Sequence, residues 1–264
     1  MTNNRSIERH FSRAADVYHQ QARVQQQAAE QLAAEVAKLG LAPRRVLDIG
    51  CGTGFLTRQM LSQFPTAEVV ALDLSPGMIE VARQQLPASP LIEFVVSDAL
   101  QFQSEQPFDL IVSSSTMQWL QPFDRLFTKL RTLLAPGGHV CSSIMLHGTL
   151  GELHTLRSEL FPSLAPLQTL PLSEAILDGL DVGGFRILHR ASYQECEWYD
   201  TPRAALRSMR EQGFTGGPLS TGPRPLTRGE LTQVLVHYEQ RFKNGTGLVP
   251  VSFHYGLYLA TLVG

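Results

Sequence analysis

The chain has 264 residues, of which 43% are hydrophobic and 17% charged, so it can bury a sizeable core and is not expected to be extensively disordered. Its 22 Lys and Arg against 24 Asp and Glu give a net charge of −2, which argues against a strongly basic nucleic-acid-binding protein. No run approaches the roughly 18 apolar residues of a membrane helix, and the N-terminus lacks a signal-peptide pattern. We therefore expect a globular, cytoplasmic protein with neither a membrane nor a nucleic-acid partner. A monomer is our expectation, although the sequence itself does not reveal the oligomeric state.

The first half of the chain predicts strands that alternate with helices. Residues 7–38 have helical spacing of small and apolar positions, which predicts one or two helices ahead of the core. Five apolar runs are typical of buried strands: 46–49, 69–72, 94–96, 109–112 and 140–145. Helical patterns lie between several of them, at 56–64, 78–85 and 123–134, and the last is expected to stop at Pro136-Gly137-Gly138. This order predicts an α/β fold with a mostly parallel, doubly wound sheet and helices on both faces.

The second half predicts a less regular arrangement. After His147 the alternation lapses until about residue 180, which indicates an insertion after the fifth strand. The remaining pattern predicts a strand at 185–199, a helix at 202–212, a Gly/Pro-rich loop at 213–225, a helix at 227–242 and a strand at 251–262. We expect one domain over residues 1–264, made of an N-terminal helical cap (1–40), a core (44–146), the insertion (147–180) and C-terminal strands and helices (181–264).

The first predicted strand ends in the motif Asp48-x-Gly50-x-Gly52-x-Gly54. Glycines at a strand-to-helix turn let the backbone approach a ligand closely. A second strand ends in Asp73, 19 residues beyond Gly54, where a carboxylate can accept both hydroxyl hydrogens of a ribose. The motif therefore indicates a nucleoside-containing ligand.

A nicotinamide dinucleotide is the obvious rival ligand. Its fingerprint is Gly-x-Gly-x-x-Gly with pyrophosphate on the helix N-terminus, but Phe55 stands where the third glycine belongs. The carboxylate of Asp48 would also repel a phosphate, whereas it suits a cationic amino-acid group. S-adenosylmethionine has a ribose, an adenine and a methionine ammonium but no phosphate. The loop resembles motif I of the Rossmann-like class I S-adenosylmethionine-dependent methyltransferases.

This resemblance implies a set of cofactor contacts. Asp73 would hold the ribose, Leu74 and Met78 would flank the adenine, and Asp98 would accept a hydrogen bond from its amino group. Alternatively, Asp98 only caps a turn and Met78 is core packing, and Cys51 is taken as a small spacer. The predicted cofactor-binding residues are Asp48, Gly50, Cys51, Gly52, Gly54, Asp73, Leu74, Met78, Ser97, Asp98, Ala99 and Ser113.

Segments outside the cofactor loop carry a more specific resemblance, which spans nearly the entire chain. They are Phe11-Ser12-Arg13-Ala14-Ala15-x-x-Tyr18, Ser113-Ser114-x-x-x-Gln118-Trp119, Gly148-Thr149-Leu150-x-Glu152-Leu153, Pro202-Arg203-Ala204-Ala205-Leu206-Arg207-x-Met209-Arg210-x-x-Gly213 and Leu226-Thr227-Arg228. With them the chain resembles the malonyl-acyl-carrier-protein O-methyltransferases of biotin synthesis (BioC type). The resemblance implies methylation of the malonyl carboxylate on acyl carrier protein, an early step of biotin synthesis, with S-adenosylhomocysteine as the second product.

Such a reaction needs no general base, because a carboxylic acid with a pKa of about 4 is already ionised near neutral pH. Tyr18 is the candidate catalytic residue, as a positioning group over the sulfonium or the malonyl group; a core tyrosine is the alternative. Gln118 and Trp119 follow the fourth strand, at the edge where ligands bind, although a core role for Trp119 is slightly favoured. The histidines show no metal-ligand spacing, so no metal is expected.

Arg203, Arg207 and Arg210 share one face of a predicted helix. An acidic carrier protein can dock there, and Arg207 can reach inward to the malonyl carboxylate; a solvated face without a partner is the alternative. Three other functions stay open: a carboxyl or small-molecule methyltransferase that uses no carrier protein, coenzyme A as the acyl carrier, and a non-catalytic S-adenosylmethionine-binding module. Nucleic-acid methylation fits less well, because no Asn/Asp-Pro-Pro-Tyr segment follows the fourth strand.

Overall fold

The computed structural model describes residues 8, 11–12, 15, 17–164, 169–214 and 224–263. The chain divides into two compact units. Unit 1 consists of Met1–Ala22, Leu146–Leu170 and Tyr193–His254, and unit 2 of Arg23–Met145, Pro171–Ser192 and Tyr255–Gly264. Residues 13–14 of the N-terminal motif and 215–223 of the predicted Gly/Pro-rich loop lie outside the described residues. The expectation of a single domain stays a prediction.

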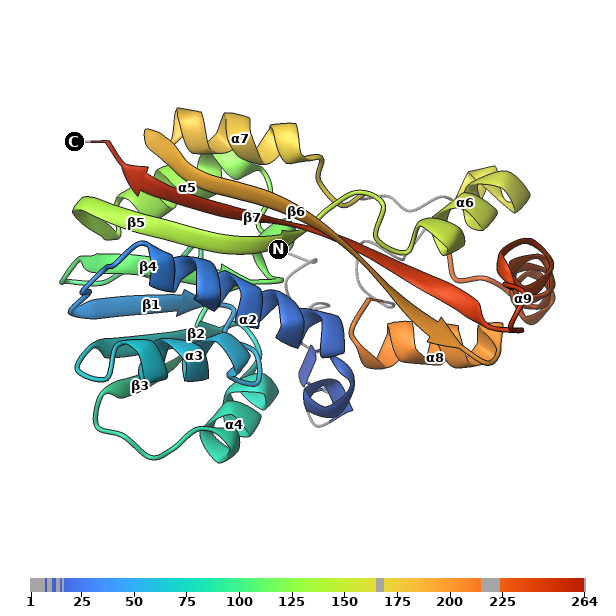
Figure 1. Cartoon of the computed structure of the whole chain (residues 1–264), viewed down its shortest axis with the longest axis horizontal. Helices are drawn as coiled ribbons and strands as arrows, with labels where there is room; N and C mark the ends of the chain where they lie inside the picture. Colours follow the sequence, from blue (N-terminus) through green and yellow to red (C-terminus); the bar gives the residue numbers. More distant parts are fainter. Residues whose placement is uncertain are drawn as a thin grey trace. The chain divides into compact units, whose positions relative to one another are not determined.

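One sheet of seven strands in the order β3-β2-β1-β4-β5-β7-β6 organises the described chain (Figure 1). Its strands are β1 Arg45–Ile49, β2 Glu68–Asp73, β3 Ile92–Val96, β4 Phe108–Ser114, β5 Leu134–Met145, β6 Phe185–Tyr199 and β7 Val249–Leu262. The pairs β1 with β2, β1 with β4, β2 with β3 and β4 with β5 are parallel, whereas β7 runs antiparallel to β5. The predicted mostly parallel α/β sheet is confirmed.

Helices of unit 2 cover this sheet. They are α2 Arg23–Lys38, α3 Phe55–Gln63, α4 Pro76–Gln85, α5 Phe123–Arg131 and α7 Ser173–Val182, with the short 3₁₀ helix η1 Met117–Trp119 after β4. Helices α5 and α7 pack closely because α7 carries glycine where they meet: a Cβ on Gly179 would lie 2.5 Å from Cβ of Phe123. Helix α7 starts at Ser173, inside the predicted insertion 147–180, and belongs to the same compact unit as most of the sheet. The bounds of the insertion stay a prediction.

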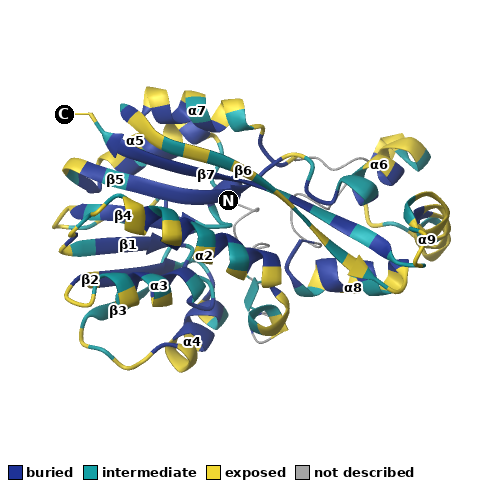
Figure 2. Ribbon diagram, in the orientation of Figure 1, coloured by how far each residue is buried: buried dark blue, intermediate teal, exposed yellow. Residues whose placement is uncertain are grey.

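The core of unit 2 lies along the central strands (Figure 2). Strand β1 is buried on both faces from Val46 to Ile49, as expected for a parallel strand that helices cover on both sides. At the end of the strand order, β6 exposes every second residue over most of its length, as expected for an edge strand with one face in solvent. Strands β1, β2 and β4 therefore lie in the interior of the strand order, away from this edge.

The boundary between α5 and β5 differs from the prediction. Helix α5 ends at Arg131 rather than at 134, and Pro136-Gly137-Gly138 lies within β5 instead of ending the helix. The pairing with β4 explains this: Phe108 pairs with Leu134 but Leu110 pairs with His139, so the extra residues form an irregularity in β5. Gly137, with φ +72°, takes the left-handed conformation that this irregularity requires.

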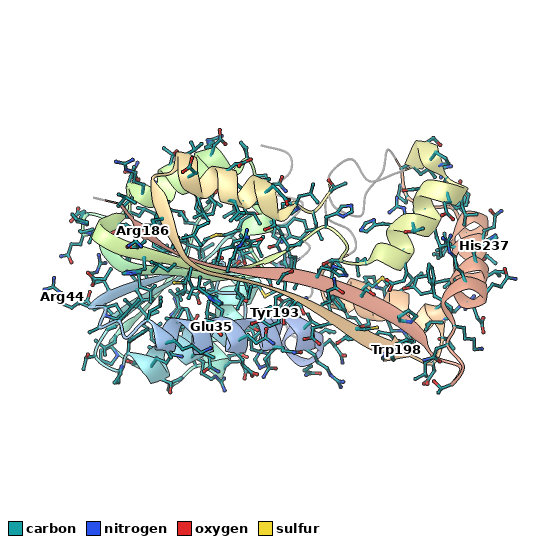
Figure 3. All side chains as sticks on the ribbon, turned by 45° about the horizontal axis from the view of Figure 1, so that its top comes forward. Glu35, Arg44, Arg186, Tyr193, Trp198 and His237 are labelled. Carbon is teal, nitrogen blue, oxygen red and sulfur yellow. The ribbon has the colours of Figure 1, made fainter. Side chains whose placement is uncertain are left out.

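Unit 1 contains the helices α6 Gly151–Leu160, α8 Pro202–Glu211 and α9 Arg228–Phe242, with η2 Pro162–Leu164 and residues of β6 and β7. Thr201 caps α8 by accepting from the Ala204 N–H at 3.1 Å, and Thr227 with Glu230 forms a capping box on α9. Trp198 on β6 and His237 on α9 are exposed (Figure 3). Within the described part of the chain, no helix is long and apolar enough to cross a membrane.

Candidate active site

The loop between β1 and α3 is a series of left-handed turns. Gly50, Gly52 and Gly54 have φ values of +68°, +54° and +92°, a region that residues with a Cβ rarely adopt. The N–H groups of Gly50 and Cys51 both donate to the carbonyl oxygen of Leu72, at 2.7 and 2.9 Å, which ties the loop to β2. The three predicted glycines are therefore required by the backbone itself.

The same glycines differ in what surrounds them. A Cβ on Gly50 would lie 2.2 Å from side-chain atoms of Thr116, and one on Gly54 would lie 3.0 Å from Leu86. A Cβ on Gly52 would meet nothing within 4 Å. Gly50 and Gly54 thus serve packing, while Gly52 presents open backbone that a ligand can approach.

Asp73 lies at the end of β2 with its carboxylate fixed by two backbone N–H groups. Gly52 donates to Oδ2 at 2.9 Å and Ser75 donates to Oδ1 at 2.8 Å. Burial raises the pKa of Asp73, and the hydrogen bonds from Ser75 and Gly52 oppose that rise. Because a carboxylate oxygen can accept more than one hydrogen bond, Asp73 is oriented and still able to accept from ligand hydroxyls.

Asp48 is fully buried at the end of β1. The Thr57 hydroxyl donates to its Oδ2 at 2.6 Å, while its Oδ1 has no hydrogen-bond partner among the described residues. Burial raises the pKa of this carboxyl to about 7, against the lowering effect of Thr57 and with a further contribution from the charge of Asp73. A buried carboxylate with an open oxygen favours a cationic ligand group, which would stabilise its ionised form.

The predicted adenine-side residues follow β2 and β3. Ser97 N–H donates to the carbonyl oxygen of Asp73 at 2.9 Å, which places the turn after β3 beside the end of β2. Asp98 accepts from the Leu100 N–H at 2.9 Å, so its carboxylate caps a turn, and Met78 is buried. These contacts agree with the alternative roles, in which Asp98 caps a turn and Met78 packs in the core. Contacts of Asp98, Met78, Leu74 and Ala99 with adenine stay a prediction.

A second turn, after β4, packs on the glycine loop. Ser115 has φ +54° although it is not glycine, and its N–H donates to the Ser143 carbonyl at 2.9 Å. The Gln118 side chain holds this turn by donating from Nε2 to the Ser115 carbonyl at 2.7 Å, and its buried Oε1 has no partner among the described residues. Thr116 closes the contact by donating to the Gly50 carbonyl at 3.2 Å.

Sequence reasoning missed Ser115 and Thr116, because nothing in a Ser-Ser-Ser-Thr run predicts a left-handed residue. It did predict Ser113 and Gln118 at this edge. The hydroxyl of Ser113 donates to the Ile49 carbonyl at 2.8 Å and so joins β4 to β1. Trp119 is half-buried in η1, and its substrate role stays a prediction.

The chain is similar in sequence to known methyltransferases. Residues 46–138 match the model of a methyltransferase domain family. The malonyl-[acyl-carrier protein] O-methyltransferase of Halalkalibacterium halodurans is 32% identical over 254 residues, which cover 90% of this chain and 91% of that protein. Malonyl-[acyl-carrier protein] O-methyltransferase 1 of Ilyobacter polytropus is 30% identical, over 89% and 87% of the two chains. The chain belongs to this methyltransferase family.

Solved structures share the fold of this methyltransferase at lower identity. Phosphoethanolamine N-methyltransferase 2 of Haemonchus contortus, in complex with S-adenosyl-L-methionine, matches with a TM-score of 0.54 and 22% identity, over 89% of this chain and 53% of that one. The [4+2]-cyclase SpnF matches with a TM-score of 0.55 and 19% identity, over 90% and 86% of the two chains. Because a cyclase shares the fold, the fold alone does not define the reaction.

The substrate-side predictions in unit 1 are exposed or partly buried. Arg203, Arg207 and Arg210 are all exposed on α8 and form no ion pair with any described residue, while Ala205 and Met209 on the other face are buried. The inward reach of Arg207 stays a prediction, as does the catalytic role of the partly buried Tyr18. Among the described residues, no group of three His, Cys, Asp or Glu side chains is arranged to hold a metal ion.

Proposed function

We propose that this methyltransferase converts the free carboxylate of malonyl-acyl carrier protein to its methyl ester, an early step of biotin synthesis, with S-adenosylmethionine as methyl donor. The observation that carries the proposal is the near full-length similarity to relatives of that name, at 30% and 32% identity. A match confined to the cofactor loop would support only a methyltransferase. Here the similarity includes the segments that flank it.

The residues at the ends of β1 and β2 fit S-adenosylmethionine. The open backbone at Gly52 gives room for close approach, Asp73 is oriented to accept ribose hydroxyls, and the orphaned Oδ1 of Asp48 suits the methionine ammonium. When bound, S-adenosylmethionine supplies a methyl group activated by its sulfonium, and transfer to a carboxylate leaves a methyl ester and S-adenosylhomocysteine. No phosphate-binding group is needed, in accord with the carboxylate that stands before the glycines.

The chain needs no general base for this reaction. A carboxylic acid with a pKa of about 4 is ionised near neutral pH, so no proton is removed before transfer. The residues therefore have to bind, align and exclude water. We assign alignment to the three predicted residues Tyr18, Gln118 and Trp119.

The arginine row of α8 (Arg203, Arg207 and Arg210) is the proposed docking surface for the carrier protein. Its three guanidinium groups are exposed, and no described carboxylate neutralises them. An acidic partner gains attraction and faster association from such a row without needing a buried contact.

The test measures methyl transfer from labelled S-adenosylmethionine to malonyl-acyl carrier protein, malonyl-coenzyme A and free malonate in parallel. The proposal expects the highest kcat/KM with the carrier protein and no labelling of carrier protein that bears acetyl instead of malonyl. Higher kcat/KM on free diacids would support a carrier-independent carboxyl methyltransferase. Cofactor binding without transfer to any of the three would contradict the proposed substrate.

A further inference from the structure

Two segments far apart in the sequence meet in unit 1. A Cβ added to Gly213, at the end of α8, would lie 2.6 Å from Cε1 of Phe11, so the Phe11 ring lies directly on the Gly213 backbone. The Phe11 ring also meets Tyr18 edge to face, with centroids 6.2 Å apart and planes at 81°. Gly213, Phe11 and Tyr18 thus form a continuous contact from α8 to the candidate catalytic tyrosine.

The end of α8 is a firm support for this contact. Gly213 has φ +80° and donates to the Arg210 carbonyl at 3.1 Å, while Phe214 donates to the Met209 carbonyl at 2.9 Å. These two bonds form a Schellman motif, in which a left-handed glycine ends the helix. Phe214 then packs on Phe253, with ring centroids 5.4 Å apart.

A partly buried polar network also holds the end of α8. The Gln212 amide donates from Nε2 to Glu197 at 2.9 Å and to the Ser208 hydroxyl at 2.8 Å. Tyr199 donates through its hydroxyl to Ser208 at 2.6 Å and also contacts Glu197. Hydrogen bonds that do not involve Phe11 therefore fix the backbone of Gly213, on which the Phe11 ring lies.

We propose that Phe11 and Gly213 are positioning residues that set the Tyr18 side chain for methyl transfer. The inference rests on the role of Tyr18 in the proposed function, and it assigns no contact between Phe11 or Gly213 and the substrate. Gly213 is required twice, for its left-handed backbone and for the space that the Phe11 ring fills. The Phe11 ring thus couples the N-terminal segment to the end of α8.

A double-mutant cycle tests whether Phe11 acts through Tyr18. Phe11→Ala should lower kcat about tenfold at saturating substrates without changing the Kd for S-adenosylmethionine, and should have no further effect in a Tyr18→Ala background. Phe11→Leu should restore part of kcat. An equal loss in both backgrounds would overturn the inference, as would a Tyr18→Ala enzyme with unchanged kcat.

A second readout is independent of the substrate. In protein with 3-fluorotyrosine at position 18, Phe11→Ala and Gly213→Ala should each shift the ¹⁹F resonance, whereas the half-buried control Phe161→Ala should not. In Gly213→Ala the added Cβ displaces the Phe11 ring, so the shifts caused by Gly213→Ala and Phe11→Ala should not add in the double variant. Unchanged resonances would contradict the contact of Phe11 with Tyr18, even if malonyl-acyl carrier protein is a substrate. Shifted resonances would support that contact even if malonyl-acyl carrier protein is not a substrate.

Discussion

The glycine loop of unit 2 and the arginine row of α8 in unit 1 represent two kinds of functional region. In the loop, Gly50 and Gly52 are left-handed and donate backbone hydrogen bonds to residues of β2, so the residue type follows from local geometry. In the row, Arg203 and its two neighbours are exposed and make no described ion pair. The backbone conformation of the loop requires its glycines, whereas only a binding partner would require the arginines of the row. Substitutions in the loop should therefore change stability and cofactor binding, and substitutions in the row should change only the binding of the partner.

The largest effect is expected from a Cβ in the open part of the loop. Gly52→Ala should weaken S-adenosylmethionine binding about a hundredfold, close to 2.7 kcal/mol, because the methyl occupies the space left for the ligand. Its cost in unfolding free energy should be only that of the left-handed conformation, about 1–2 kcal/mol. Calorimetric titration and denaturant unfolding measure the two quantities separately.

Two matched glycines serve as controls. Gly137→Ala has φ +72° and open space as well, so it should cost similar stability and leave cofactor binding unchanged. Gly50→Ala should cost about 1–3 kcal/mol more than either, because its Cβ overlaps Thr116. Equal binding by Gly52→Ala and Gly137→Ala proteins would show that the loop is not the cofactor site.

Removing the arginine row should weaken only the binding of the carrier protein to the enzyme. Replacing Arg203, Arg207 and Arg210 together by Ala should raise KM for malonyl-acyl carrier protein about tenfold at low ionic strength, with little change in kcat. Salt screens exposed charges, so the difference from the wild type should shrink as salt is added. Steady-state kinetics from low to high salt measures both effects.

Two exposed arginines of β6 provide a control for the loss of surface cations elsewhere. Arg186→Ala with Arg190→Ala removes two surface cations from unit 2 and should leave KM for the carrier unchanged. An unchanged KM at low salt in the α8 triple variant would contradict docking on the row, whatever the activity of the enzyme.

The strands of the sheet and the left-handed glycine loop could be predicted from the sequence for a physical reason, whereas the cofactor contacts stay a prediction. Parallel strands are long apolar runs, and a left-handed turn demands glycine, so both leave a residue-level trace. Prediction from the sequence failed where a residue adopts a conformation that is unusual for its type. Ser115 is left-handed without being glycine, and Pro136-Gly137 lies inside a strand instead of ending a helix. The contact of Phe11 with Gly213 left no local trace, since it depends on tertiary packing.

The raised pKa of Asp48 predicts that cofactor affinity increases with pH. Burial places that pKa at about 7 in the free protein, so the carboxyl is about half ionised at pH 7 and about a tenth ionised at pH 6. A ligand ammonium binds the ionised form, lowers the pKa and releases the proton. The association constant should therefore rise about fivefold from pH 6 to pH 7, below the range where an α-amino group with a pKa near 8 loses its own charge.

Asp48→Asn is the matched variant for this effect, because it keeps the shape of the side chain and cannot ionise. Its cofactor affinity should be lower at pH 7 and nearly flat between pH 6 and pH 7 when measured by calorimetric titration. A variant that kept the slope of the wild type would assign the titration to another group, such as Asp73, whose pKa burial also raises.

The smallest effect is expected from a variant that weakens the helix α8 and leaves its arginines in place. Thr201→Ala removes the cap on the Ala204 N–H and should lower the free energy of unfolding by about 1 kcal/mol, as Thr227→Ala should for the capping box of α9. Because Pro202 and the buried face of α8 still hold the helix, the arginine row stays in place and KM for the carrier should be unchanged. If Thr201→Ala raises KM as much as the triple arginine variant does, then the row acts through the position of α8 and not through its charge, and the contrast with the glycine loop is lost.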